Sequence, residues 1–381
     1  MLPCLATAMS TRTVLLFSDA PVFSGAERYL DLLAKALPRD RYRPTLALSE
    51  LGALDGFARQ AKGYGIPVLR LPRLDRLGER GPFLKLLRFF ATKRFDVMHF
   101  NLTDPRACNG AMTAARFARR GKFVVTEHLP QSPFDAKKTP YRHRVAMRNT
   151  AWTIVNSESY RESVEARPDH RGQVVVIPNG IEDLGPINQK RRLEAKARLT
   201  MPAGGRTIGW VGRVTAQKDP AMLLDVMKLV LPKRLDATFV IIGDGDHLPQ
   251  LQRGVKDANL SDRVRFYGHR QDVPDLLPAM DLLINTSTYE GMPFSILEAM
   301  VQGIPVVARG IPGMADLVGP GATGWIPPKD TPEAFCRTVL DALKYPERLA
   351  SYGRAARERT LTLFSVDRLC ERTMTEVYDR I

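Results

Sequence analysis

Two glutamates that flank a short turn, Glu290 and Glu298, are the side chains best suited by type and spacing to chemistry in this chain. The apolar run Leu282–Thr286 before them predicts a buried strand, and Pro293 between them suits the first position of a helix. Free backbone amides at the start of a helix point toward the preceding turn and bind anions. The stretch therefore predicts a phosphate site with one carboxylate in front of it and one behind.

Strands that alternate with helices run along the whole chain and must position this turn. The first is Thr13–Ser18, which leads through a glycine turn into a helix. The same alternation continues to residue 360, and it is typical of a parallel sheet covered by helices on both faces. We therefore expect an α/β fold of two doubly wound (Rossmann-like) domains, over residues 1–180 and 187–360. A helix over residues 361–381 is expected to cross back to the first domain.

The composition is that of a soluble globular protein, with 44% hydrophobic and 25% charged residues. No apolar run reaches roughly 18 residues, so we expect no transmembrane helix. Residues 1–10 lack the basic start and apolar core of a secretory signal, and residues 1–9 have no visible role. The scattered cysteines predict reduced thiols and no metal site. These features predict a cytoplasmic protein.

Positive charge is concentrated in the first half of the chain. Residues 1–180 hold 29 Lys and Arg against 16 Asp and Glu, and the remainder holds 27 against 25. This asymmetry predicts an anionic partner for the first domain, such as the inner face of a membrane; a solubilising surface is the alternative. The segment Phe83–Phe95 is basic and amphipathic, with Leu84, Leu87, Phe90 and Ala91 on one face, and it would lie on that membrane or cover the sheet. Nucleic acid is not expected, because no zinc spacing or helix-turn-helix pattern is present.

Seven short motifs, in order along nearly the whole chain, resemble those of glycosyltransferase family 4. They are Ser24-Gly25-Ala26-Glu27-Arg28, Thr126-Glu127-His128, Ile177-Pro178-Asn179-Gly180-Ile181, Val211-Gly212-Arg213 with Lys218, Gly243-Asp244-Gly245, Gly268-His269-Arg270, and Glu290 with Glu298. Each motif alone is weak, whereas the ordered set is specific. The resemblance implies the GT-B architecture and a retaining glycosyltransferase that uses a nucleotide sugar.

The resemblance also implies donor-binding roles in the second domain. Arg213 and Lys218 resemble the cations that bind the donor diphosphate, where fixed positive charge stabilises the leaving group without a metal. Glu298 resembles the glutamate that accepts hydrogen bonds from the ribose, and Glu290 resembles its partner near the donor sugar. The main chain between the two glutamates would contact the sugar or the phosphates through Gly291, Met292, Pro293 and Phe294.

Three further positions take their expected roles from the resemblance. His128 resembles a histidine that contacts the donor sugar, and a purely structural histidine after a strand is the alternative. Gly25 resembles a loop glycine near the diphosphate and the acceptor, although the family usually has two adjacent glycines and Ser24 replaces the first. Arg270 resembles a position that lines the base pocket.

The tripeptide Asp244-Gly245-Asp246 leaves two interpretations open. It looks like the Asp-x-Asp of metal-dependent transferases, and a magnesium site can consist of few carboxylates with substrate phosphates. It also fits the family's glycine turn near the base, which is the interpretation that we prefer. We therefore expect no metal and no cofactor, the nucleotide sugar being a substrate.

The expected activity is transfer of a sugar from a nucleotide sugar to a glycan or lipid-linked acceptor, with retention of configuration, in the synthesis of surface polysaccharide or glycolipid. No residue is an obvious general base, so a donor phosphate oxygen would take the acceptor proton. The alternatives are a nucleotide-sugar epimerase of the same architecture and a non-catalytic nucleotide-sugar-binding protein. A glycosidase that uses Glu290 and Glu298 is disfavoured, because a hydrolase needs neither the cationic pair nor a nucleotide domain.

Overall fold

The chain forms two compact units in a computed structural model that describes residues 11–74, 79–130, 141–168, 170–202 and 204–381. The first unit is Met1–Gly180 together with Val366–Ile381, and the second is Ile181–Ser365. Residues 1–9, for which the sequence indicates no role, lie outside the described residues. Each unit contains one sheet, and each is described below by itself.

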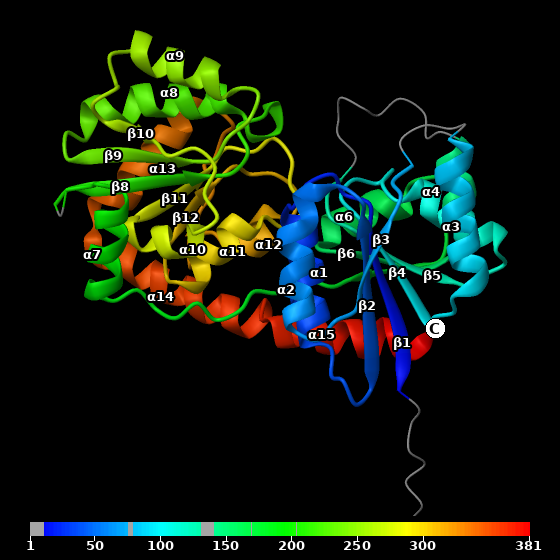
Figure 1. Cartoon of the computed structure of the whole chain (residues 1–381). Helices are drawn as coiled ribbons and strands as arrows, with labels where there is room; N and C mark the ends of the chain where they lie inside the picture. The colour runs from blue at the N-terminus through cyan, green and yellow to red at the C-terminus, as the bar shows by residue number, and fades with distance from the viewer. Residues whose placement is uncertain (1–10, 75–78, 131–140, 169, 203) are drawn as a thin grey trace, which may run out of the picture. The chain divides into compact units, whose positions relative to one another are not determined.

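A seven-stranded parallel sheet, in the order β3-β2-β1-β4-β5-β6-β7, forms the centre of the first unit (Figure 1). Its central strands are continuous buried runs, as a sheet with helices on both faces requires. The strands are β1 Arg12–Ser18, β2 Tyr42–Ser49, β3 Val68–Leu71, β4 Val97–Leu102, β5 Phe123–Glu127, β6 Thr150–Val155 and β7 Gln173–Val176.

Helices cover both faces of this sheet (Figure 1). Leu15 and Phe17 of β1 pack with α3 and α4 in one apolar cluster. Helix α1 packs with α2 and α15. The helices of the unit are α1 Gly25–Ala36, α2 Asp55–Gly63, α3 Arg80–Thr92, α4 Asn109–Phe117, α5 Tyr141–Ala146, α6 Glu158–Glu165 and α15 Val366–Arg372.

Helix α3 covers the sheet, which is one of the two roles predicted for the segment Phe83–Phe95. Leu86 and Phe90 are buried in the core beneath it. Leu84, expected on the same apolar face as Phe90, is instead 59% exposed. The buried face differs from the predicted one because α3 also packs against α4. The outer face of α3 is therefore basic with one exposed leucine.

The C-terminal segment is anchored in the first unit by buried polar contacts. The Tyr378 hydroxyl is hydrogen-bonded to His99 Nδ1 at 2.7 Å, and His99 Nε2 is hydrogen-bonded to Thr126 Oγ1 at 2.7 Å. Nearby, Arg41 forms an ion pair with Asp379 at 2.9 Å. Burial lowers the pKa of His99 to about 3, so the ring is neutral and offers one donor and one acceptor. The last residues of the chain are thus fixed to β4 and β5.

A six-stranded parallel sheet, in the order β10-β9-β8-β11-β12-β13, forms the centre of the second unit (Figure 1). Trp210 and Phe239 pack with α8, α9 and α13 on one face. Val240 and Leu283 pack with α7, α10, α11, α12 and α14 on the other. The strands are β8 Arg206–Val211, β9 Ala237–Ile242, β10 Val264–Phe266, β11 Leu282–Asn285, β12 Val306–Ala308 and β13 Gly324–Trp325. The helices are α7 Gln189–Arg198, α8 Pro220–Val230, α9 Leu248–Asp257, α10 Val273–Leu276, α11 Phe294–Val301, α12 Met314–Val318, α13 Pro332–Lys344 and α14 Pro346–Leu363.

Both sheets have a switch point between two central strands. In the first sheet the chain moves outward from β1 to one edge and from β4 to the other; in the second it does the same from β8 and β11. Connections that leave in opposite directions separate the loops at the carboxyl ends of the two central strands, and ligands of open α/β sheets bind there. The predicted class, two doubly wound α/β sheets, is confirmed.

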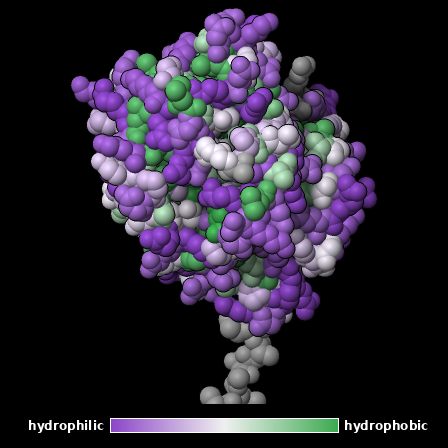
Figure 2. Space-filling model, turned by 90° about the vertical axis from the view of Figure 1, so that its left-hand side faces the viewer, coloured by the Kyte–Doolittle hydropathy of each residue, from purple (hydrophilic) through white to green (hydrophobic). Residues whose placement is uncertain are grey.

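The molecular surface is mainly polar on the face that Figure 2 shows, with small apolar clusters among hydrophilic side chains. Scattered apolar side chains of this kind are normal for a folded protein. Within the described part of the chain, every helix is too short or too polar to cross a bilayer.

The anchor at Tyr378 predicts a measurable loss of stability when its hydroxyl is removed. We expect Tyr378→Phe to lower the free energy of unfolding of the first unit by about 1–3 kcal/mol, because the buried His99 Nδ1 loses its partner. Urea unfolding measures it in a Trp210→Phe/Trp325→Phe background, in which the fluorescence comes from Trp152 of the first unit. Tyr64→Phe removes an exposed hydrogen bond with Gln60 and should cost less than about 0.5 kcal/mol. Equal effects of the two changes would contradict the anchor.

Candidate functional site

Lys218 and Glu290 meet at the switch point of the second sheet. Lys218 follows β8 and Glu290 follows β11, and the Lys218 ammonium forms an ion pair with Glu290 Oε1. The two side chains are only 13% and 5% exposed. Ser287 Oγ also donates to Glu290 Oε1, at 2.8 Å. A carboxylate buried this far needs such compensation, and the fold supplies it by joining two loops distant in the sequence.

Hydrogen bonds from neighbouring residues fix the two loops against each other. Thr288 N donates to the Gln217 carbonyl at 2.8 Å. Gln217 Nε2 donates to the Tyr289 carbonyl at 3.0 Å, and Thr286 Oγ1 donates to the Lys218 carbonyl at 2.7 Å. Hydrogen bonds between the two loops thus help to set the geometry around the ion pair.

The loop after β8 is supported from behind by the glycine turn after β9. Val214 N donates to the Asp244 carbonyl at 2.9 Å. A Cβ atom on Gly243 would lie 1.8 Å from the Gly212 carbonyl oxygen, and one on Gly245 would lie 2.5 Å from that of Val214. Only glycine allows so close an approach of two backbones. The predicted glycine turn therefore has a clear structural role, which is to support the loop that carries Arg213 and Lys218.

Arg213 differs from Lys218 in its surroundings. Its side chain is exposed, and it makes no hydrogen bond or ion pair with the residues that the structure describes. Two cations therefore stand in one loop at the carboxyl end of β8, one neutralised by a carboxylate and one available to an anion.

Helix α11 begins four residues after Glu290, close to where the sequence predicts it, but one detail differs. Pro293 is the N-cap, with φ −71° and ψ 127°, and not the first helical residue. The residue before it, Met292, is buried, as is Gly291. Phe294 therefore starts the helix. Ile296 N already donates to the Pro293 carbonyl at 3.2 Å, so among the described residues the amides of Phe294 and Ser295 are the ones without a helical partner. Glu298 is half-buried on the second turn. The structure thus gathers the predicted donor-binding stretch beside Lys218.

Arg309 directly follows β12 and stabilises this arrangement. Its Nη1 donates to Asp219 Oδ2 at 2.7 Å and to the Thr286 carbonyl at 3.1 Å. Asp219 follows Lys218 in a left-handed conformation, with φ 48°, and caps α8 by accepting from Met222 N at 3.1 Å. A non-glycine residue in this conformation costs free energy, which the ion pair and the cap offset.

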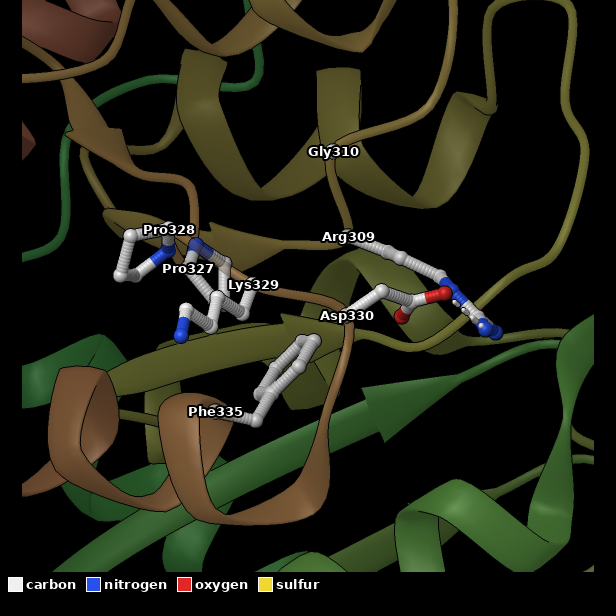
Figure 3. A pocket seen from close by; sticks show the side chains of 7 residues that line it. All are labelled: Arg309, Gly310, Pro327, Pro328, Lys329, Asp330 and Phe335. Atoms are coloured by element: carbon white, nitrogen blue, oxygen red, sulfur yellow. Dashed lines mark hydrogen bonds and ion pairs between the residues drawn. The ribbon is translucent and has the colours of Figure 1, made fainter.

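A small pocket adjoins the site. Figure 3 shows the Arg309 side chain extending beside Asp330, whose Oδ2 accepts from Arg309 Nη2 at 2.6 Å. Neither Lys218 nor Glu290 lines this pocket, so it is a neighbour of the candidate site and not part of it. The lining residues are Arg309, Gly310, Pro327, Pro328, Lys329, Asp330 and Phe335.

Gly25 lies at the switch point of the first sheet, as the first residue of α1. The loop before it is held by the fully buried Glu27. Ser24 donates to Glu27 Oε2 through its amide at 3.1 Å and its hydroxyl at 2.6 Å, and Ser18 Oγ donates to Oε1 at 2.9 Å. Burial raises the pKa of Glu27, and these hydrogen bonds oppose that rise. Both ends of the loop are fixed to one carboxylate.

His128 follows β5 and is buried. Its Nε2 is hydrogen-bonded to Asn101 Oδ1 at 2.6 Å, and its ring packs edge-on against Tyr29 with 4.8 Å between ring centroids. Burial lowers the pKa of His128 to about 3. The imidazole is therefore neutral at physiological pH, which suits a hydrogen-bonding group better than a general base.

Arg270 and the Asp244-Gly245-Asp246 turn contribute less. Arg270 forms a two-pronged ion pair with Asp272, at 2.7 Å for both contacts, and no hydrogen bond or ion pair joins it to Lys218 or Glu290. Its role at the base pocket stays a prediction. In the part of the chain that the structure describes, no three His, Cys, Asp or Glu side chains gather in a way that could hold a metal ion. Metal independence also stays a prediction.

Four residues that shape these sites were not singled out from the sequence: Gln217, Ser287, Arg309 and Asn101. Gln217 and Ser287 adjoin Lys218 and Glu290, and their polar side chains at strand ends were an available signal. Arg309 and Asn101 carried no local signal, because their partners lie in other loops.

Two family profiles match the chain, one in each half. The first, described as Glycosyltransferase Family 4, matches residues 23–183. The second, described as Glycosyl transferases group 1, matches residues 205–345. Together they span both switch points.

Similar proteins of known name are found among bacterial transferases. The chain is 26% identical over 310 residues to the UDP-Gal:alpha-D-GlcNAc-diphosphoundecaprenol alpha-1,3-galactosyltransferase of Escherichia coli, which covers 78% of this chain and 79% of that protein. It is 31% identical over 218 residues to the lipopolysaccharide core biosynthesis mannosyltransferase LpsB of Rhizobium meliloti, over 54% of this chain and 62% of that protein. The structure of HepE from Anabaena in complex with UDP and glucose has a TM-score of 0.83 at 24% identity and covers 97% of this chain and 100% of that one. This last likeness concerns the fold alone.

The buried ion pair predicts a strong coupling between its two members. We expect Lys218→Met to destabilise the second unit by about 3 kcal/mol, because it leaves the Glu290 carboxylate buried without its cation. The double variant Lys218→Met/Glu290→Gln should lose less than the sum of the single changes, with a coupling of about 1–3 kcal/mol. Urea unfolding in a Trp152→Phe background measures this, because the other tryptophans lie in the second unit.

Lys228→Met is the matched control, since Lys228 forms an exposed ion pair with Asp225. Its loss should cost less than about 1 kcal/mol. Additive effects of the Lys218 and Glu290 changes would show that the two side chains do not interact in solution.

Proposed function

The chain belongs to glycosyltransferase family 4, and we propose that it transfers a hexose from a nucleotide-sugar donor to a glycan or lipid-linked acceptor with retention of anomeric configuration. One observation carries this proposal. Arg213, Lys218, Glu290 and the start of α11 all lie at one switch point, where the sheet brings together cations, a carboxylate and free helix amides. Such a set matches the diphosphate and sugar of a nucleotide sugar.

The donor is held, in this proposal, by groups that already have fixed positions. A lysine ammonium has three N–H donors, so Lys218 can keep its bond to Glu290 and still bind a phosphate oxygen. Arg213, whose guanidinium has no ion pair or hydrogen bond among the described residues, is available to the same diphosphate. The amides at the start of α11 add partial positive charge. Glu298 accepts hydrogen bonds from the ribose hydroxyls. Because these groups need little rearrangement, they stabilise the charge that the leaving diphosphate gains.

The chemical step follows from what the site holds. The glycosidic bond to the diphosphate breaks, the acceptor hydroxyl forms the new bond on the same face of the sugar, and a donor phosphate oxygen receives the hydroxyl proton. His128 is neutral and hydrogen-bonded to Asn101, so we assign it a contact to the donor sugar and not proton abstraction. Gly25, at the start of α1, keeps the role near the diphosphate and the acceptor that its family position implies.

The relatives suggest which compounds to test first. The Escherichia coli enzyme is named for a UDP-sugar and a diphosphoundecaprenol acceptor, and the Rhizobium enzyme for the lipopolysaccharide core. Both are transferases, which favours transfer over epimerisation or silent binding. We therefore propose a UDP-sugar donor and a role in the synthesis of surface polysaccharide or glycolipid.

The proposed activity predicts that removal of either cation, Lys218 or Arg213, strongly lowers the rate of sugar transfer. In the presence of a UDP-sugar and a lipid-linked acceptor, we expect the protein to release UDP, and Lys218→Ala or Arg213→Ala to lower kcat about 100- to 1000-fold through the loss of leaving-group stabilisation. A thermal-shift screen first identifies the donor, since a bound ligand raises the unfolding temperature. Proton NMR of the product then reports its anomeric configuration.

Arg253→Ala, on the exposed surface of α9, is the control and should keep full activity. Full activity of Lys218→Ala would refute the assigned site. Conversion of the nucleotide sugar in the absence of any acceptor would identify an epimerase instead.

The acceptor side of the proposal includes an anionic membrane. Leu84 on α3 is 59% exposed and Phe117 on α4 is 61% exposed, and the Phe83 and Phe117 rings lie 6.3 Å apart. Lys85 and Arg88 are exposed on the same helix as Leu84. Two apolar side chains among basic ones are suited to a membrane of anionic lipids, and we call this surface the α3–α4 face. It would place the protein on the cytoplasmic side of the membrane.

Vesicle sedimentation tests this surface. We expect the protein to sediment with phosphatidylglycerol vesicles at low salt, and not with phosphatidylcholine vesicles, because salt-sensitive attraction supplies much of the binding. The double variant Leu84→Glu/Phe117→Glu should lose most of the bound fraction. Leu235→Glu, at an 84% exposed leucine of the second unit, should bind as the unchanged protein does. Indifference to lipid charge at low salt would refute the proposal.

A further inference from the structure

Asn101 is a fully buried polar side chain at the switch point of the first sheet. It is the next-to-last residue of β4, and the strand register places it beside Thr126 of β5. The residues on either side, Phe100 and Leu102, belong to the apolar core. Burying a carboxamide costs free energy unless both of its ends are hydrogen-bonded. Its partners therefore indicate why this position is polar.

The two ends of the Asn101 carboxamide are hydrogen-bonded to two different segments of the chain. Nδ2 donates to the Ala26 carbonyl at 3.1 Å, and Oδ1 is hydrogen-bonded to His128 Nε2 at 2.6 Å. Ala26 directly follows Gly25 in the first turn of α1, and His128 directly follows β5. One side chain thus connects the two positions of the first unit to which we assign contacts with the donor.

These contacts determine which imidazole nitrogen carries the proton. A backbone carbonyl can only accept, so the amide nitrogen of Asn101 must face Ala26 and the amide oxygen must face His128. That oxygen can only accept in turn, so His128 Nε2 carries the hydrogen. In a neutral ring Nδ1 is then an acceptor. It has no hydrogen-bond partner among the residues that the structure describes.

We propose that Asn101 is a positioning residue for sugar transfer: it fixes His128 in the Nε2–H tautomer and ties the ring to the first turn of α1, beside Gly25. His128 Nδ1 is then held ready to accept a hydrogen bond from a hydroxyl of the donor sugar. The effect on transfer rests on the proposed function, whereas the tautomer is a property of the free protein.

The other contacts of His128 act on different atoms. Asn156 Nδ2 donates to the His128 carbonyl at 3.3 Å, and His128 N donates to the Leu102 carbonyl at 3.3 Å. Tyr29 packs against the ring with 68° between the ring planes, which limits its tilt but does not select a tautomer. Within the described residues, Asn101 alone is hydrogen-bonded to a ring nitrogen of His128, so Asn101 is the residue that selects the tautomer of His128.

Imidazole NMR tests the tautomer without any substrate. Long-range proton–nitrogen correlation spectra of the full chain, labelled with ¹⁵N-histidine and assigned through His128→Gln, should show a protonated Nε2 and an unprotonated Nδ1. This pattern should persist from pH 8 to pH 5, because the buried ring resists protonation. A protonated Nδ1, or titration near the ordinary value for histidine, about 6.5, would overturn the proposal.

Two variants separate positioning from support of the fold. Asn101→Ala should leave a mixture of tautomers, and Asn101→Asp should favour the doubly protonated ring, because a carboxylate stabilises imidazolium. Asn156→Ala removes a contact to the backbone of His128 and should leave the tautomer unchanged. An unchanged tautomer and pKa of His128 in both Asn101 variants would refute the assignment. If these variants do not fold, the spectra of the unchanged protein decide alone.

Kinetics then test the consequence for transfer. We expect Asn101→Ala to lower kcat about 10- to 100-fold, with the donor KM changed less than about threefold, because a misplaced contact affects the reacting geometry more than binding. The double variant Asn101→Ala/His128→Gln should be no slower than His128→Gln. Unchanged kcat in Asn101→Ala, with Lys218→Ala inactive, would refute the positioning role alone. Full activity of Lys218→Ala would instead refute the proposed function and leave the tautomer result standing.

Discussion

In both units the chain leaves the two central parallel strands in opposite directions. This topology imposes one constraint on both units, which is that polar groups gather where the two central strands end. The backbone amides and carbonyls there leave the sheet, and the loops that continue from them turn in opposite directions. In the second unit this brings Lys218 to Glu290, and in the first it brings Asn101 between α1 and β5. The candidate functional residues Lys218, Glu290 and Asn101 therefore lie where loops distant in the sequence meet.

Almost every polar group at these two points is satisfied within its own unit. Glu290 has an ammonium and a hydroxyl, Glu27 has three donors, and Asn101 is bonded at both ends. Full satisfaction makes the loops rigid, since any displacement would leave a buried group unpaired. The exceptions among the described residues are His128 Nδ1, which has no hydrogen-bond partner, and Arg213, an exposed cation without an ion pair. A diphosphate that binds there meets a fixed framework and one free charge, an arrangement that favours the charge developing in the transition state.

Sequence reasoning found what depends on local pattern and missed what depends on distant contact. The strand before Glu290 and the glycine turn at Gly243 are local signals, and both are present in the structure. The left-handed Asp219 could not be predicted, because it is stabilised by Arg309 from another strand. The buried side of α3 differs from the predicted one for the same reason, because the apolar residues of α3 pack against α4 as well as against the sheet. Leu84 was expected on the same face as Phe90, yet Phe90 is buried and Leu84 is exposed.

Ser24 shows how one departure from the family pattern is accommodated. Where the family usually has a first glycine, Ser24 has φ −141° and ψ −170°, an extended conformation open to any residue. Glycine is therefore not required there for conformational reasons. The hydroxyl adds a bond of 2.6 Å to Glu27, which a glycine could not make. With serine in place of glycine the loop is less flexible, and the buried Glu27 carboxylate accepts a second hydrogen bond from Ser24. Gly25 still begins the helix without a side chain. Close approach of a ligand to the backbone thus depends on Gly25, and the rigidity of the loop depends on Ser24.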